Sequence, residues 1–111
     1  MRNFHTSVVE RREPFQGILE TQPYEVGWAS EAIFFVKFEE LQVPPEGFDV
    51  HVQFAADGID WIPEGTTIGP VRATGTYHAR VRHFGGWLRL ASDLGDPSAH
   101  CVATVHLVLK E

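Results

Sequence analysis

The stretch FDVHVQFAADG, residues 48–58, decides the fold class of this 111-residue chain. Every second residue from Phe48 to Phe54 is apolar, and polar side chains stand between them. This two-residue period is typical of an antiparallel strand with one buried face. The Asp57-Gly58 pair that follows is the strongest short signal for a hairpin turn. The segment therefore predicts a half-buried strand that turns back into antiparallel pairing.

Segments on both sides of this strand extend the same interpretation. Residues 31–43 are rich in aromatic and β-branched side chains, which favours a strand, and the VPPEG that follows ends it. Residues 75–84, 87–92 and 100–111 also alternate, whereas PEGTTIGP, residues 63–70, is expected to be a loop. The pattern predicts an all-β, antiparallel, jelly-roll-like β-sandwich of seven or eight strands.

One domain is expected, because 111 residues suit a single folding unit. Residues 1–14 are polar and are interpreted as an N-terminal arm or an irregular first strand, and residues 15–111 as the sandwich. In FQGILETQPYEV, residues 15–26, a short strand is expected to break at Pro23.

Two later segments carry a family resemblance. VQFAADGIDW and HFGGWLRL resemble discoidin-type jelly-roll modules, and the GTY…R strand and the final ATVHLVLK are similar to small β-sandwich domains of phage virion and bacterial surface proteins. The resemblance extends from Val50 to Lys110 and implies a jelly roll. Its matching residues are Asp57, Gly58, Trp61, Gly75, Tyr77, Phe84, Trp87, Leu88, Arg89 and Leu90. The chain lacks the terminal cysteines of full discoidin modules, so their lipid or sugar site is not carried over.

Composition excludes several classes of protein. The net charge of −6 and the pI near 5.4 argue against a general nucleic-acid binder. The N-terminal sequence has no apolar core of a signal peptide, and no apolar run approaches the length of a membrane span. These features predict no membrane span; they leave the compartment unknown, with cytoplasmic assembly or a virion as the expectation. The single cysteine, Cys101, lies in an alternating apolar run and is expected to be a buried, inert thiol.

Basic side chains gather in a region without any acid. From Gly65 to Ser92 there is no Asp or Glu. His78, Arg80 and Arg82 repeat every second residue and so share one strand face. The full candidate basic face comprises Arg72, His78, Arg80, Arg82 and Arg89.

Three interpretations of this basic face stay open at the level of sequence. It could be a solvated outer face, a surface that binds a small anion, or a seam against an acidic region of another copy. The candidate acidic region is FEELQVPPEGFD, with Glu39, Glu40, Glu46 and Asp49.

The tryptophans and histidines of the sequence are candidates for ligand and metal sites. Trp61 and Trp87, with Arg80 or Arg82, could form a carbohydrate- or anion-binding site. Six histidines occur, but no His-x-His pair stands beside an acidic ligand, so no metal and no cofactor are expected. The chain contains no nucleophile-elbow, zinc-protease or phosphate-loop motif.

These observations predict a non-enzymatic structural protein. It would form a homo-oligomer, or join other subunits of a virion- or sheath-like particle, through charge-complementary sandwich surfaces and an N-terminal arm. The alternative is a carbohydrate- or anion-binding β-sandwich module with a glycan as partner. A metal-dependent enzyme of cupin type is a third possibility.

Overall fold

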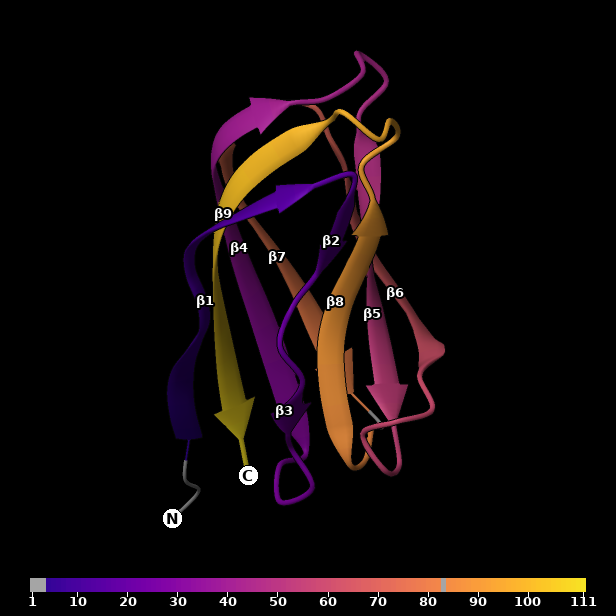
Figure 1. Cartoon of the computed structure of the whole chain (residues 1–111). Helices are drawn as coiled ribbons and strands as arrows, with labels where there is room; N and C mark the ends of the chain where they lie inside the picture. Colours follow the sequence, from indigo (N-terminus) through magenta and orange to yellow (C-terminus); the bar gives the residue numbers. More distant parts are fainter. Residues whose placement is uncertain (1–3, 83) are drawn as a thin grey trace.

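The chain folds into nine β-strands (Figure 1). The structure, a computed structural model, describes residues 4–82 and 84–111. The strands are β1 (Phe4–Gln16), β2 (Ile18–Glu20), β3 (Tyr24–Glu25), β4 (Glu31–Gln42), β5 (Phe48–Ala55), β6 (Ile62–Val71), β7 (Gly75–Arg82), β8 (Trp87–Asp93) and β9 (His100–Lys110). Within the described ranges there is no helix long and apolar enough to cross a membrane.

Two antiparallel sheets pack face to face as a sandwich. One has the order β1-β9-β4-β7, and the other has the order β6-β5-β8-β2, with β3 also paired to β8. The sheets join where Gln16 pairs with Ile18 across Gly17, whose φ of 73° suits glycine. Strands pair in nested fashion, β1 with β9, β2 with β8, β4 with β7 and β5 with β6. This nesting is the jelly-roll arrangement, so the expected fold class is confirmed.

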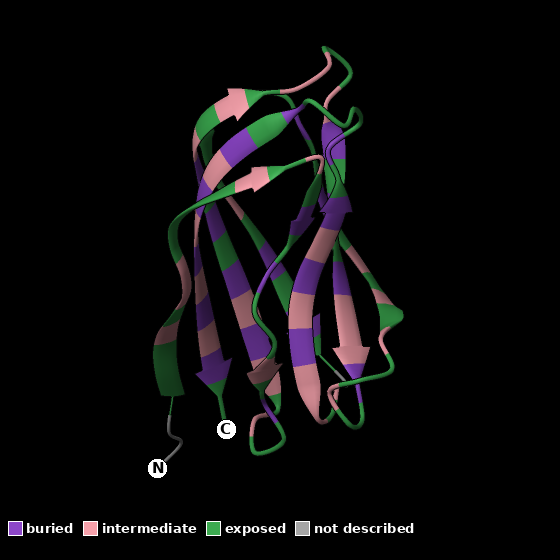
Figure 2. Ribbon diagram, in the orientation of Figure 1, coloured by how far each residue is buried: buried purple, intermediate pink, exposed green. Residues whose placement is uncertain are grey.

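Side-chain alternation builds the core between the sheets. Every second residue is buried along the whole of β9, over residues 31–38 of β4 and over residues 48–52 of β5, which gives the banded pattern of Figure 2. The ring of Phe38 on β4 packs edge-on against Phe48 and Tyr77, at 5.6 and 5.9 Å between ring centroids. Burying large aromatic side chains contributes about 1.5–3 kcal/mol each, so this interior suffices to hold the two sheets together.

The long first strand bends around one side of the sandwich. Register shifts interrupt its pairing with β9 on both sides of Glu10, and Arg12 adopts a φ of +46°. The backbone N–H of Arg12 donates to Thr104 Oγ1 at 3.0 Å, and the Thr104 hydroxyl donates to Glu39 Oε1 at 3.1 Å. The other Glu39 oxygen is buried and forms an ion pair with the Arg12 guanidinium. These contacts connect β1, β9 and β4 at the point where β1 bends.

Two expectations from the sequence change here. Residues 63–70 were expected to be a loop, but they lie in β6, and this prediction is wrong. Because β6 is an edge strand, Pro63 and Pro70 can occupy it without breaking the interior of a sheet. The N-terminal segment is the irregular first strand rather than a free arm over residues 4–14, since β1 pairs with β9 of the same chain. The strand count is nine rather than seven or eight because β6 adds a strand and because β2 and β3 are separate.

Candidate functional site

The outer face of the four-stranded sheet presents the basic row that the sequence predicted. On β7, His78, Arg80 and Arg82 are exposed, while Ala79 and Val81 between them are buried. The predicted orientation of this strand is therefore confirmed. β7 is an edge strand with β4 as its neighbour, so the row stands along one margin of the sheet.

Two arginines of this row and one lysine of β9 line a hollow on the same face. Arg80 and Arg82 of β7 and Lys110 of β9 line it together with Glu31 and Ile33 of β4, and its volume is about 290 Å³. Glu31 is the acid of this hollow, and its Oε1 lies 3.6 Å from Arg82 Nη2 in an exposed, long ion pair. In the part of the chain that the structure describes, no ion pair involves Arg80 or Lys110. The hollow thus holds more positive than negative charge.

Next to the hollow, the same face carries apolar side chains. Phe35 lies between His78 of β7 and His106 of β9 in register, and Val8 of β1 lies on the other side of His106. Phe35 and Val8 are 37 % and 41 % exposed. The Phe35 and His78 rings are 6.3 Å apart. An apolar centre with a charged margin is the usual composition of a protein–protein interface.

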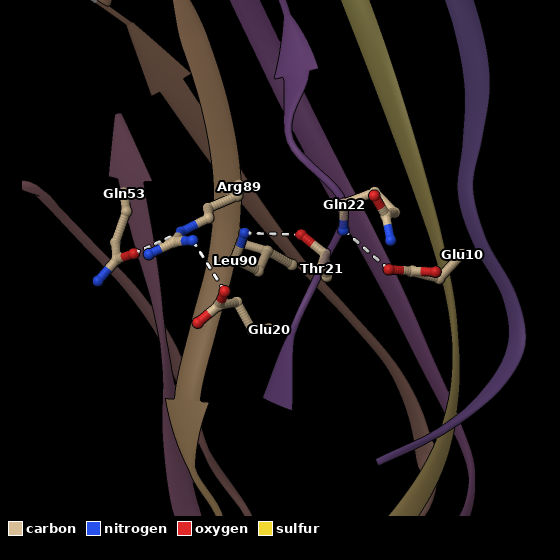
Figure 3. Close-up of polar contacts among 7 residues, drawn as sticks. All are labelled: Glu10, Glu20, Thr21, Gln22, Gln53, Arg89 and Leu90. Carbon is tan, nitrogen blue, oxygen red and sulfur yellow. Dashed lines mark hydrogen bonds and ion pairs between the residues drawn. The ribbon is translucent and has the colours of Figure 1, made fainter. Parts of the chain in front are cut away.

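On the outer face of the five-stranded sheet, by contrast, Arg89 has polar partners within the chain. Arg89 of β8 donates from Nε to Gln53 Oε1 at 2.7 Å and from Nη1 to Glu20 Oε1 at 2.9 Å (Figure 3). Its guanidinium lies 4.4 Å from the centroid of the Trp61 ring, and its side chain is 17 % exposed. Arg89 is therefore a structural centre of this face, with its charge already paired.

Two hydrogen bonds connect the segment between β2 and β3 to the strands on its two sides. The backbone N–H of Leu90 donates to Thr21 Oγ1 at 3.0 Å, and the N–H of Gln22 donates to Glu10 Oε2 at 2.8 Å (Figure 3). These contacts link β8 and β1 to the chain between them, and so hold the edge of the five-stranded sheet in place.

The two sheets differ in charge. The strands of the four-stranded sheet hold six Lys or Arg and five Asp or Glu, which gives +1. The strands of the five-stranded sheet hold one Arg and five Asp or Glu, which gives −4. Exposed carboxylates on this acidic sheet include Glu20, Asp49 and Asp93. A further carboxylate, Asp57 in the β5–β6 loop, has its pKa lowered because it accepts hydrogen bonds from the backbone N–H groups of Asp60 and Ile59.

The candidate basic face is only partly brought together. His78, Arg80 and Arg82 share one face, but Arg89 lies on the other sheet. Arg72 follows β6, where its Nε donates to the carbonyl of Glu46 at 3.3 Å. Sequence reasoning missed Lys110, because its place beside Arg80 and Arg82 depends on β4 lying between β7 and β9.

The candidate acidic face is also divided. Glu39 and Glu40 belong to β4 of the four-stranded sheet, and Glu39 is held by Arg12. Glu46 lies in the β4–β5 loop, and Asp49 lies on β5 of the other sheet. The sequence segment therefore does not form one surface, and the acids that share a face come from β2, β5 and β8.

The proposed tryptophan site does not come together with its arginines. Trp61 stacks on Arg89, and Trp87 packs over the β5–β6 loop so closely that a Cβ on Gly58 would lie 3.2 Å from its ring. Both contacts belong to the five-stranded side, whereas Arg80 and Arg82 belong to the other sheet.

Among the described residues, no arrangement of side chains favours a metal site or a reactive thiol. No group of three or more His, Cys, Asp or Glu there could hold a metal ion. His83 lies outside the described residues. Cys101 is buried on β9, and burial raises the pKa of its thiol to about 11. The thiol is therefore protonated near neutral pH.

Comparison with known proteins gives the fold. No family model and no curated protein matches the sequence. The SPBc2 prophage-derived protein YomS is similar in structure, with a TM-score of 0.64 and 10 % identity over 100 % of this chain and 96 % of that one. PorU from Porphyromonas gingivalis, described as dimeric and latent, has a TM-score of 0.54 at 9 % identity, over 99 % of this chain and 13 % of that one. The chain thus shares a β-sandwich with a prophage-derived protein, and the discoidin resemblance stays a prediction.

Proposed function

We propose that this protein is a non-enzymatic assembly subunit that joins copies of itself, or other subunits of a virion- or sheath-like particle, through charge-complementary sheet faces. The observation that carries the proposal is the charge difference between the two sheets, +1 against −4. In this arrangement the face with Arg80, Arg82 and Lys110 of one copy contacts the face with Asp49 and Asp93 of the next, while Glu20 stays paired with Arg89.

The basic face has the composition that such a contact needs. Phe35 and Val8 supply apolar area at its centre, and the arginines of β7 stand at its margin. Arginine forms bidentate bonds with carboxylates, so Arg80 and Arg82 suit exposed Asp and Glu side chains of a partner. Surface ion pairs contribute mainly orientation and association rate, while the apolar centre supplies affinity.

Contact between two different faces produces head-to-tail association. Such heterologous contacts close into rings or extend into filaments, depending on the rotation between successive copies. The fold shared with a prophage-derived protein agrees with a role in a particle, although the likeness carries no function by itself.

The first test is the native mass of the purified protein, measured by light scattering at about 50 mM and about 500 mM NaCl. The Debye length falls from roughly 14 Å to roughly 4 Å over this range, so a charge-directed oligomer dissociates as salt rises. A monomer at both salt concentrations and at high protein concentration would contradict self-assembly.

Charge reversal separates assembly from folding. Arg80→Glu with Arg82→Glu makes both faces acidic and is expected to yield folded monomers. Asp49→Lys with Asp93→Lys weakens the acidic face in the same way, and a mixture of the two double variants is expected to assemble again. The control is Arg72→Glu, a single charge reversal of the same kind at an exposed position outside the face, and it should leave the mass unchanged.

A small-anion module is the second candidate, because Arg80, Arg82 and Lys110 line one hollow. Titration with sulfate at constant ionic strength distinguishes the two. Saturable binding to a protein that stays monomeric would favour the anion module over assembly.

A further inference from the structure

An aromatic groove lies at the end of the sandwich where β1 begins. Its volume is about 900 Å³, and it lies between the start of β1 and the β3–β4 connection. Phe4, His5, Pro23, Tyr24, Glu25, Trp28 and Glu111 line it. It shares no residue with the hollow of Arg80, Arg82 and Lys110.

Two aromatic rings of this groove are exposed to solvent. Phe4 is 73 % exposed and Trp28 is 44 % exposed, whereas Phe34 and Phe38 in the core are 1 % exposed. Tyr24, the third ring, is partly buried against the core. The rings of Phe4 and Trp28 are not packed into the core, so their faces are available to a ligand.

A hydrogen-bonded cluster fixes the groove between β1 and β3. The Tyr24 hydroxyl and Ser7 Oγ are in hydrogen-bond contact, and Ser7 Oγ lies 2.8 Å from His5 Nε2. The Ser7–Tyr24 contact joins β1 to β3, two strands of different sheets, at this groove. Glu25 is held as well, since its Oε1 accepts a hydrogen bond from the N–H of Gly27 at 2.8 Å. Its second oxygen takes no part in that bond.

The charges of the groove select the chemistry of its ligand. Glu25 and Glu111 contribute carboxylates, and no lysine or arginine is among the described residues that line the groove. Among the described residues of the lining, His5 carries the one titratable nitrogen, and its Nε2 is engaged with Ser7. Aromatic faces attract cations through the ring quadrupole, and neighbouring carboxylates add to this attraction. We propose that this groove binds an organic ammonium cation, with Trp28 and Phe4 as the aromatic surfaces and Glu25 as the counter-charge.

Choline is the probe for this site, because 3,3-dimethylbutan-1-ol has the same shape without the charge. Binding is followed by the ¹H–¹⁵N signal of the Trp28 indole, identified by its loss in Trp28→Phe, with NaCl added to equalise ionic strength. Choline is expected to shift this signal saturably and to bind about fivefold more tightly than the neutral isostere, as an exposed cation–π contact implies.

Variants tie this binding to the groove. Trp28→Leu is expected to abolish choline binding, measured by calorimetry, while Trp28→Phe keeps part of it because the ring face remains. Glu25→Gln keeps an oxygen for the N–H of Gly27 and is expected to weaken binding a few-fold through the lost charge alone. Trp61→Phe, on the outer face of the five-stranded sheet, serves as the control and should bind as the unmodified protein does.

Three results would overturn the proposal. Equal affinity for choline and its isostere would make the groove an apolar site without charge selection. A shift with methyl β-glucoside and none with choline would make it a glycan site. No shift with any of these probes would show that the groove binds none of them. Since the groove and the basic face share no residue, each result is independent of whether the protein assembles.

Discussion

Arg80 and Arg89 have the same side chain, and the two sheets hold them in opposite ways. Arg89 is 17 % exposed, bonded to Gln53 and Glu20 and stacked on Trp61. Arg80 is exposed beside Ile33, and within the described chain no ion pair involves it. A paired arginine stabilises its own sheet, whereas an arginine without a carboxylate is free to meet one on another molecule.

This difference teaches that a count of basic residues does not define a binding face. Arg89 was grouped with Arg80 and Arg82 because all three lie in one acid-free region of the sequence. The one acid that pairs with Arg89, Glu20, comes from β2 and lies far away along the chain. The contribution of each arginine to folding or to binding is therefore set by its neighbours in space.

The largest expected effect separates the two arginines directly. Arg89→Met removes two hydrogen bonds and a ring contact, and should lower the free energy of unfolding by about 1–2 kcal/mol. Arg80→Met should change it by less than about 0.5 kcal/mol, because an exposed side chain without a partner contributes little to stability. Urea unfolding of both variants at equal concentration measures the difference. Equal losses would break the comparison.

A smaller effect is expected where β1 bends across the four-stranded sheet. Arg12→Ala and Arg12→Gly both lose the ion pair with Glu39. Only glycine accepts the φ of +46° without strain. Arg12→Gly should therefore be about 1 kcal/mol more stable than Arg12→Ala. Thermal unfolding of the two variants measures this, and a more stable alanine variant would show that the bend relaxes when the arginine is lost.

The smallest effect concerns the acidic side of the molecule. Asp57 has a lowered pKa because its carboxylate accepts hydrogen bonds from the N–H groups of Asp60 and Ile59. Its charged form therefore stabilises the fold above the unfolded pKa near 3.8, and this stabilisation is lost as pH falls through the lower folded value. Asp57→Asn should lower Tm slightly at pH 7, and the difference should shrink as pH falls below 3.8. A difference that persists in acid would assign the effect to shape rather than charge.

The sequence predicted the orientation of side chains within strands better than the arrangement of the strands. Alternation placed Phe48, Val50 and Val52 inside, and the same two-residue period placed Arg80 and Arg82 outside. Strand β6 was missed because its prolines and glycines are typical of loops, although an edge strand tolerates them.

Sheet membership was beyond the reach of single-chain patterns. The hollow forms because β4 lies between β7 and β9, and neither strand is adjacent to β4 in the sequence. For the same reason, Asp49 was grouped with Glu39 and Glu40, which lie on the opposite sheet. The groove of Trp28 could not be found from the sequence, because it depends on β1 and β3 meeting across the edge of the sandwich.

The nested pairing of strands has a consequence for the order of events in biosynthesis. β9 lies between β1 and β4, so the four-stranded sheet lacks its central strand until residues 100–110 have been made. Chains dominated by such distant pairings fold slowly, because long loops must close before the contacts form. The basic face, which needs Lys110 beside Arg80 and Arg82, is therefore absent from every shorter nascent chain. In the proposed assembly, an unfinished chain would therefore lack the basic face, and association would begin only after β9 is complete.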